Sequence, residues 1–163
     1  MPRYMISIDQ SLSSSGVVVW EEGEPYRYLA LQTDKSLSEV ERLAYIEERL
    51  LELFLTYTPK RVVIEGLSYG SISSSVRVLA GLYYLILLHL FRLNIPVSIV
   101  PPSALKKFAT GSGRAKKKDM FEALPEDIKK ELMLQFKTLK SGRGDVTDAY
   151  WLGKYDIENG ESK

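Results

Sequence analysis

Hydrophobic and polar positions along the chain predict three strands, followed by helices that alternate with two more strands. Residues 4–8 and 16–20 are short apolar runs rich in β-branched side chains, and residues 26–33 alternate loosely, so each is read as a strand. The turn-forming residues 22–25 (EGEP) separate the second strand from the third. Because the connections between these strands are short, we predict an antiparallel meander.

Apolar residues recur at helical spacing from near residue 36 to residue 57. Pro59, two residues further on, marks the end of this predicted helix. Residues 73–93 form a second helix that is apolar nearly all round. Such a helix is either fully buried or lies in an interface between subunits. The remaining predicted elements are strands at 61–64 and 95–100 and helices at 103–108, 115–124, 125–136 and 145–155.

This order of elements predicts an α/β fold with a mixed five-stranded sheet, three strands antiparallel and two parallel, flanked by helices on both faces. The parallel part follows because strands separated by a helix are usually joined by a crossover connection. The length of 163 residues suits one domain, which we assign to residues 1–157. Residues 158–163 are expected to form a polar C-terminal tail.

The composition excludes several kinds of chemistry. The absence of cysteine rules out disulfides, thiolate metal sites and a cysteine nucleophile. The single histidine, His89, argues against a zinc site and is expected to be a packed or rim residue. Any metal would therefore be held by oxygen ligands, which favours Mg²⁺ or Mn²⁺.

The net charge is only +1, but six positive side chains fall within residues 106–118. Such a local concentration suits a polyanionic partner. No signal peptide is visible, and the most apolar segment, residues 78–91, is shorter than the ~18 residues of a membrane span. We therefore expect a cytoplasmic protein with no membrane association.

Four carboxylates follow a pattern that predicts a metal site. Asp9 ends the first strand, Glu65 ends the fourth, and Asp145 and Asp148 share one face of the last helix. The carboxyl ends of parallel strands form the usual ligand crevice of an open sheet. Four acids in one crevice repel one another unless divalent cations lie between them, and two cations are a known arrangement for hydrolysis at phosphorus.

Two of these acids also have simpler interpretations. Asp145 could cap the last helix, because an acid is favoured in the first turn. Asp9 could close an Asx-turn, because it precedes a serine-rich stretch. Glu65, followed by Gly66, has fewer such explanations.

Four parts of the chain form an ordered set of motifs. They are residues 6–9 (ISID) with 13–16 (SSSG), 62–65 (VVIE), 102–106 (PSALK) with 111–117 (GSGRAKK), and 145–149 (DVTDA). In this set the chain resembles the RuvC family of Holliday junction resolvases, within the RNase H-like superfamily, and the resemblance extends over almost the whole chain.

The resemblance implies a homodimer that cuts two opposed strands of a four-way DNA junction with two Mg²⁺ ions per active site, for which Mn²⁺ would substitute. It assigns metal binding and catalysis to Asp9, Glu65, Asp145 and Asp148, and it places Lys117 beside the scissile phosphate as a further catalytic residue. The residues expected to contact DNA are Tyr69, Arg77, Lys106, Lys107, Arg114, Lys116 and Lys118.

The chain departs from the family at one position. Members of the family carry an aromatic residue three positions after the glutamate, where this chain has Ser68, followed by Tyr69. Either Tyr69 takes over by a shift of one residue, or the loop engages the junction differently. The basic stretch and the segment 69–77 also have simpler readings, as a solvated helix start and an ordinary loop.

The sequence is also compatible with three other functions. A related nuclease of looser specificity would cut flaps, forks or three-way junctions. A non-catalytic junction-binding protein would bind DNA but not cut it. Residues 8–15 also resemble the first phosphate loop of sugar kinases in the actin-like ATPase group, but this chain is too short for two such domains and lacks a second phosphate loop. The host, which could be a phage or mobile element, and any branch-migration partner are not predicted.

Overall fold

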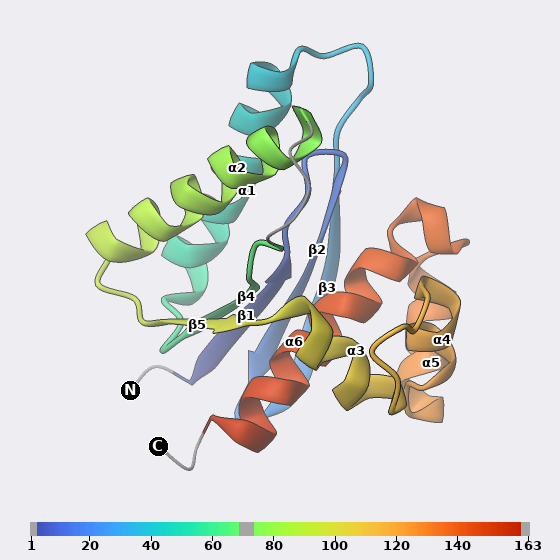
Figure 1. Ribbon diagram of the computed structural model, residues 1–163. Helices are drawn as coiled ribbons and strands as arrows, with labels where there is room; N and C mark the ends of the chain where they lie inside the picture. The colour runs from blue at the N-terminus through green and yellow to red at the C-terminus, as the bar shows by residue number, and fades with distance from the viewer. Residues whose placement is uncertain (1–2, 69–73, 161–163) are drawn as a thin grey trace.

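A five-stranded mixed sheet separates two layers of helices (Figure 1). The structure is a computed structural model that describes residues 3–68 and 74–160. The strands are β1 (Tyr4–Asp9), β2 (Ser14–Glu21), β3 (Glu24–Gln32), β4 (Val62–Glu65) and β5 (Val97–Val100). The helices are α1 (Glu39–Tyr57), α2 (Ser74–Arg92), α3 (Pro102–Thr110), α4 (Lys117–Glu122), α5 (Glu126–Gln135), the 3₁₀ turn η1 (Leu139–Ser141) and α6 (Arg143–Asn159).

The strand order across the sheet is β3-β2-β1-β4-β5. The pairs β3–β2 and β2–β1 are antiparallel, whereas β1–β4 and β4–β5 are parallel. The predicted mixed sheet is therefore confirmed, and its central strand β1 lies between an antiparallel and a parallel neighbour.

Successive side chains of a strand point to opposite faces of the sheet, so apolar side chains form two cores, one on each face. Ile6 and Ile8 of β1 pack with α1 and α2, whereas Met5 of β1 packs with the helices of the other layer. Figure 1 shows α1 and α2 on one side and α3 to α6 on the other. Helices therefore cover both faces of the sheet, as predicted.

The turn between β2 and β3 is shorter than expected. Glu22 and Gly23 both have positive φ, of 52° and 84°, as a two-residue hairpin turn of this handedness requires. The strand β3 therefore begins at Glu24 instead of residue 26. Pro25 lies within it, opposite a register shift at Val19 and Trp20, and is tolerated there because β3 is an edge strand.

The helix α6 begins two residues before the predicted start, because Gly142 adopts φ 107° and forms its N-cap. The helix also continues to Asn159, so it includes the first two residues of the expected tail. Asp145 is consequently the third residue of the helix and does not cap it. The capping interpretation of Asp145 is therefore wrong.

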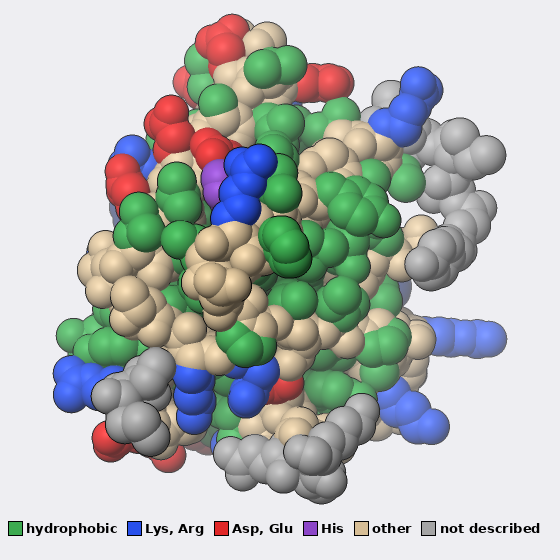
Figure 2. All heavy atoms as spheres, turned by 90° about the vertical axis from the view of Figure 1, so that its left-hand side faces the viewer, with side chains coloured by type: hydrophobic (Ala, Val, Ile, Leu, Met, Phe, Trp, Pro, Cys, Tyr) green, Lys and Arg blue, Asp and Glu red, His purple; other side chains and the backbone are tan. Residues whose placement is uncertain are grey.

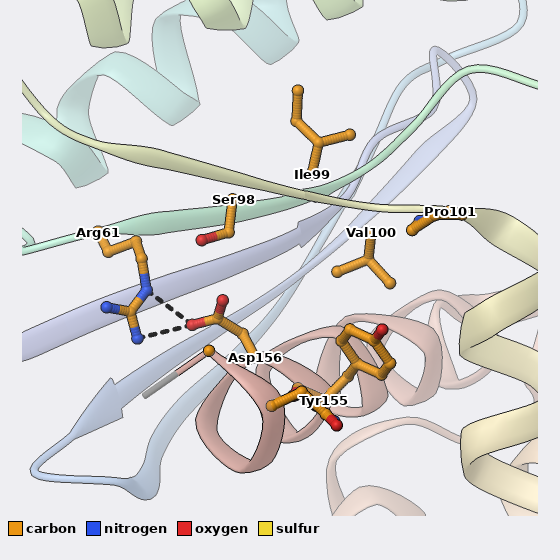
Figure 3. A pocket seen from close by; sticks show the side chains of 9 residues that line it. Arg61, Ser98, Ile99, Val100, Pro101, Tyr155 and Asp156 are labelled. Carbon is orange, nitrogen blue, oxygen red and sulfur yellow. Dashed lines mark hydrogen bonds and ion pairs between the residues drawn. The ribbon is translucent and has the colours of Figure 1, made fainter. Parts of the chain in front are cut away.

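An ion pair ties the far end of α6 to the sheet. Arg61 Nε donates a hydrogen bond of 2.6 Å to Asp156 Oδ2, and the Asp156 side chain is only 6% exposed. The pair borders a hollow of about 400 Å³ between β5 and α6. Figure 3 shows the pair together with Ser98 and Tyr155, which also line this hollow. The pair therefore holds the C-terminal end of α6 against the start of β4.

The helix α2 is buried on one side only. Leu82, Ile86 and Leu90 lie in the core, whereas Tyr84, Leu88 and Phe91 are exposed at 63%, 40% and 79%. The exposed side chains recur at helical spacing. Ile99 of β5 lines a pocket together with Tyr84, and Val97, two residues before Ile99, is on the same side of that strand and is also exposed; we call these five residues the α2 face. Figure 2 shows hydrophobic side chains gathered on this side of the molecule. None of the helices in the described residues is long and apolar enough to cross a membrane.

Candidate active site

The sheet places Asp9 and Glu65 side by side. The parallel register of β1 and β4 pairs Ile8 with Ile64, so the next residue of each strand is an acid. The turn after Asp9 is held by a different residue, since Ser15 Oγ accepts from Ser11 N–H at 2.9 Å and donates to the Ser11 carbonyl at 2.6 Å. This leaves the Asp9 carboxylate to face its acidic neighbours.

Close packing of α6 brings the other two acids to the same place. Gly16 lies opposite Asp9 in the β1–β2 register, and a Cβ at Gly16 would overlap the backbone carbonyl of Asp145. Further along the helix, the buried Ser7 hydroxyl donates a hydrogen bond of 2.6 Å to the Ala149 carbonyl. A small residue and a hydroxyl on the strands thus set the position of the helix that carries Asp145 and Asp148.

The ammonium group of Lys117, at the first position of α4, joins the two acids of α6. Lys117 Nζ lies 3.0 Å from Asp145 Oδ1 and 3.3 Å from Asp148 Oδ2. Partial burial acts to lower the pKa of Lys117, but Asp148, Asp9 and Asp145 outweigh it, so the pKa lies above its usual value. Lys117 therefore keeps its proton and its positive charge within the acid cluster.

Burial and mutual repulsion act on the acids in the opposite sense. Burial raises the pKa of Asp9 well above its usual value, and the charges of Asp148 and Glu65 raise it further. Burial also raises the pKa of Glu65 and of Asp148, while Lys117 acts to lower both. The acids are therefore close enough to oppose one another's ionisation, which is the condition for a site that attracts cations.

A hollow of about 400 Å³ opens between two of the acids, Glu65 and Asp148, and the basic stretch; we call it the acid–lysine hollow. Its charged lining residues are Glu65, Asp148, Lys106, Arg114, Lys116 and Lys117. Pro102 and Leu105 of α3 and Met120 of α4 form its apolar wall. A phosphodiester could thus meet cationic side chains on one side and carboxylates on the other.

The carboxylate oxygens of the acid cluster suit a hard divalent cation, although the side chains are not already arranged as a complete set of metal ligands. Within residues 3–68 and 74–160, no three acidic or histidine side chains form a preformed ligand group. However, Asp148 Oδ1 is buried and accepts no hydrogen bond from the described residues, so it is free to serve as a ligand. Carboxylate oxygens are the donors that Mg²⁺ prefers.

The structure separates the other predicted DNA-contacting residues from this hollow. Lys107 and Lys118 are exposed but do not line it, and Arg77 is exposed on the first turn of α2. Tyr69 lies outside the described residues. His89 lies on α2, where its Nε2 is 2.7 Å from Glu47 Oε1 of α1, so it takes no part in the acid cluster.

The packing roles of Gln10 and Gly16 could not be predicted from the sequence. Gln10 Nε2 donates a hydrogen bond of 2.7 Å to the backbone carbonyl of Glu65, and Gly16 admits the backbone of Asp145. Both contacts join segments far apart in the chain, so no local pattern reveals them.

Comparison with known proteins identifies relatives of the chain. A family model described as "Crossover junction endodeoxyribonuclease RuvC" matches residues 5–138, which include Asp9, Glu65 and Lys117 but end before Asp145. A protein of that same name from Treponema denticola is 28% identical over 124 residues, which cover 74% of this chain and 70% of the relative.

Solved structures share the fold. The Thermus thermophilus RuvC structure superimposes with a TM-score of 0.70 at 19% identity, covering 96% of both chains. T. thermophilus RuvC in complex with a Holliday junction substrate gives a TM-score of 0.68 at 17% identity, covering 93% of this chain and 90% of the other. The expected RNase H-like arrangement of the sheet and helices is therefore confirmed.

Proposed function

This chain belongs to the RuvC family of crossover junction endodeoxyribonucleases, and from that membership we propose that it resolves four-way DNA junctions by paired, symmetric nicks. The observation that carries the proposal is the meeting of Asp9, Glu65, Asp145 and Asp148 around Lys117, beside a basic wall. A nuclease needs this combination, because phosphate must be bound and water must be activated at the same place.

In the proposed mechanism each group has a distinct task. Asp9, Glu65, Asp145 and Asp148 would hold two Mg²⁺ ions, or Mn²⁺ in their place, which would activate a water and stabilise the leaving oxygen. Lys106, Arg114 and Lys116 would bind the phosphates on either side of the cut. Lys117 retains its proton and would offset negative charge that develops on the phosphate.

Paired nicks require two active sites, and we propose that the α2 face forms a homodimer interface. Its exposed Tyr84, Leu88 and Phe91 make an apolar surface that a lone subunit would leave in water. A two-fold axis through this surface would repeat the acid–lysine hollow on the partner. We place the enzyme in the cytoplasm, where bacterial DNA lies.

A second candidate is a branched-DNA nuclease of looser specificity. It is favoured by Ser68, which stands where the family carries an aromatic residue at the junction centre and which is exposed in this structure. Such an enzyme would use the same acids but would also cut flaps or three-way junctions.

The deciding experiment is a cleavage assay on four-way, three-way and flap DNA, with Mg²⁺ and with EDTA. We expect the wild-type protein to cut the four-way junction symmetrically and only with the metal. Comparable rates on all three substrates would favour the looser nuclease, and junction binding without cleavage would contradict both candidates.

The same assay tests the acids through Asp9→Asn. We expect cleavage to fall at least 10³-fold while junction binding is retained or tightened, because a negative charge near the phosphate is lost. Asp127→Asn, on the exposed first turn of α5, is the matched control and should cleave normally. Cleavage that persists in Asp9→Asn would refute the assignment of the acids.

A further inference from the structure

Gln10 is a buried polar residue directly beside the acid cluster. It follows Asp9 in the chain and is only 6% exposed, although it lies outside β1. Its Nε2 donates a hydrogen bond of 2.7 Å to the backbone carbonyl of Glu65. The residue after one acid is thus bonded to the main chain of another.

This bond lies where the backbone pairing between the two strands stops. The β1–β4 register runs from Ile6–Val62 to Ile8–Ile64 and includes no pair at Asp9 and Glu65. The pairing of β4 with β5, its other neighbour, continues for longer. Glu65 lies opposite Val100, and Gly66 N–H donates a hydrogen bond of 2.8 Å to the Val100 carbonyl. The Gln10 amide therefore supplies a cross-link between β1 and β4 one residue beyond the ladder.

The unpaired half of the amide indicates that this contact serves more than stability. Gln10 Oε1 is buried and accepts no hydrogen bond from the described residues. Turning the amide over would set Oε1 against the Glu65 carbonyl, two acceptors facing each other, so the orientation follows from the chemistry. An apolar side chain of similar shape would avoid the unpaired oxygen, but it would lose the bond to Glu65.

We propose that Gln10 is a positioning residue for the metal-binding acids: it fixes the backbone of Glu65 relative to Asp9, so that the two carboxylates lie together in the acid cluster, beside the acid–lysine hollow that Glu65 lines. The inference rests on the proposed function, because it assumes that these acids hold the cations. Nothing in the mechanism requires Gln10 to touch DNA or metal itself.

The test is Gln10→Met, which keeps the length of the side chain and removes the donor. We expect Mg²⁺ affinity, measured by calorimetry without DNA, to fall about tenfold, as is typical when a residue that orients a ligand is lost. We also expect kcat on the four-way junction to fall by about the same factor, with KM for the junction unchanged. Gln135→Met, on the exposed surface of α5, is the control.

Three outcomes separate the possibilities. A folded Gln10→Met protein with normal Mg²⁺ affinity and normal kcat would overturn the inference, even if its urea stability had changed. If Gln10→Met does not fold, Gln10→Asn replaces it, because that side chain keeps the amide but is one methylene too short to reach Glu65. If the wild-type protein cuts no junction but Gln10→Met still weakens Mg²⁺ binding, the positioning role stands and the proposed function falls.

Discussion

At the scale of single residues, the acids destabilise the fold that presents them. Burial raises the pKa of Asp9, Glu65 and Asp148, and the negative charges of neighbouring acids raise each of them further. The folded chain therefore binds protons at these groups more tightly than the unfolded chain does. Their contribution to stability is fully present below their unfolded pKa of about 4 and is lost as the pH rises through the folded pKa.

Asp9→Asn should consequently raise the free energy of unfolding. In EDTA at pH 7 we expect an increase on the order of 1 kcal/mol, because the variant removes an acid whose ionisation is opposed by burial and by its acidic neighbours. The difference should shrink towards pH 4, where Asp9 is protonated in the folded wild-type protein. Urea unfolding between pH 4 and pH 8 measures this. A variant less stable than wild type at pH 7 would show that Asp9 is favourably paired.

Asp9 and Glu65 could be predicted from the sequence because each is an acid at the end of an apolar strand. The position of Lys117 between Asp145 and Asp148 could not, because it depends on how α4 packs against α6. The bond from Gln10 to Glu65 was equally hidden, since it joins residues 55 positions apart through one side-chain atom.

At the scale of elements, the helix α6 determines whether the site exists. It packs against β1 and β2 closely enough that a Cβ at Gly153 would overlap the Trp20 indole, as one at Gly16 would overlap Asp145. The Trp20 indole N–H in turn donates to Ser7 Oγ at 2.9 Å, the same hydroxyl that bonds the helix. Small residues thus allow the contact, and polar groups fix its register.

Gly16→Ala tests this contact. The added methyl group must push the first turn of α6 away from the strands, so we expect a loss of about 1–3 kcal/mol in the free energy of unfolding, as for other overpacked sites. Cleavage should fall further than stability explains, because Asp145 and Asp148 move with the helix. Gly113→Ala, whose Cβ would meet nothing within 4 Å, is the stability control. Wild-type stability and cleavage in Gly16→Ala would contradict the close packing.

The order and sense of the strands could be predicted because short turns and intervening helices leave few alternatives. The ends of the helices and strands were harder to predict, because they depend on single backbone angles. The early start of β3 requires Glu22, an ordinary side chain, to adopt positive φ, and the early start of α6 requires the same of Gly142. Which side of the apolar helix 73–93 would be buried also depended on where the sheet placed it.

At the scale of the whole molecule, symmetric cutting depends on the proposed dimer. Phe91→Glu places a charge at the most exposed residue of the α2 face, and we expect it to yield a monomer by analytical ultracentrifugation at concentrations where the wild-type protein is a dimer. Single nicks should then replace paired ones. Leu134→Glu, on α5 and 85% exposed, should leave the dimer intact. A dimeric Phe91→Glu protein would place the interface elsewhere.

The late position of α6 in the chain has a consequence for the cell that makes this protein. A chain that stops before residue 143 contains the strands and two of the acids, but neither Asp145 nor Asp148. During translation, and in any prematurely terminated product, the proposed DNA-cutting centre would thus stay incomplete until the final helix has emerged and docked. Unfinished chains would thereby lack two of the four acids that the proposed cleavage requires.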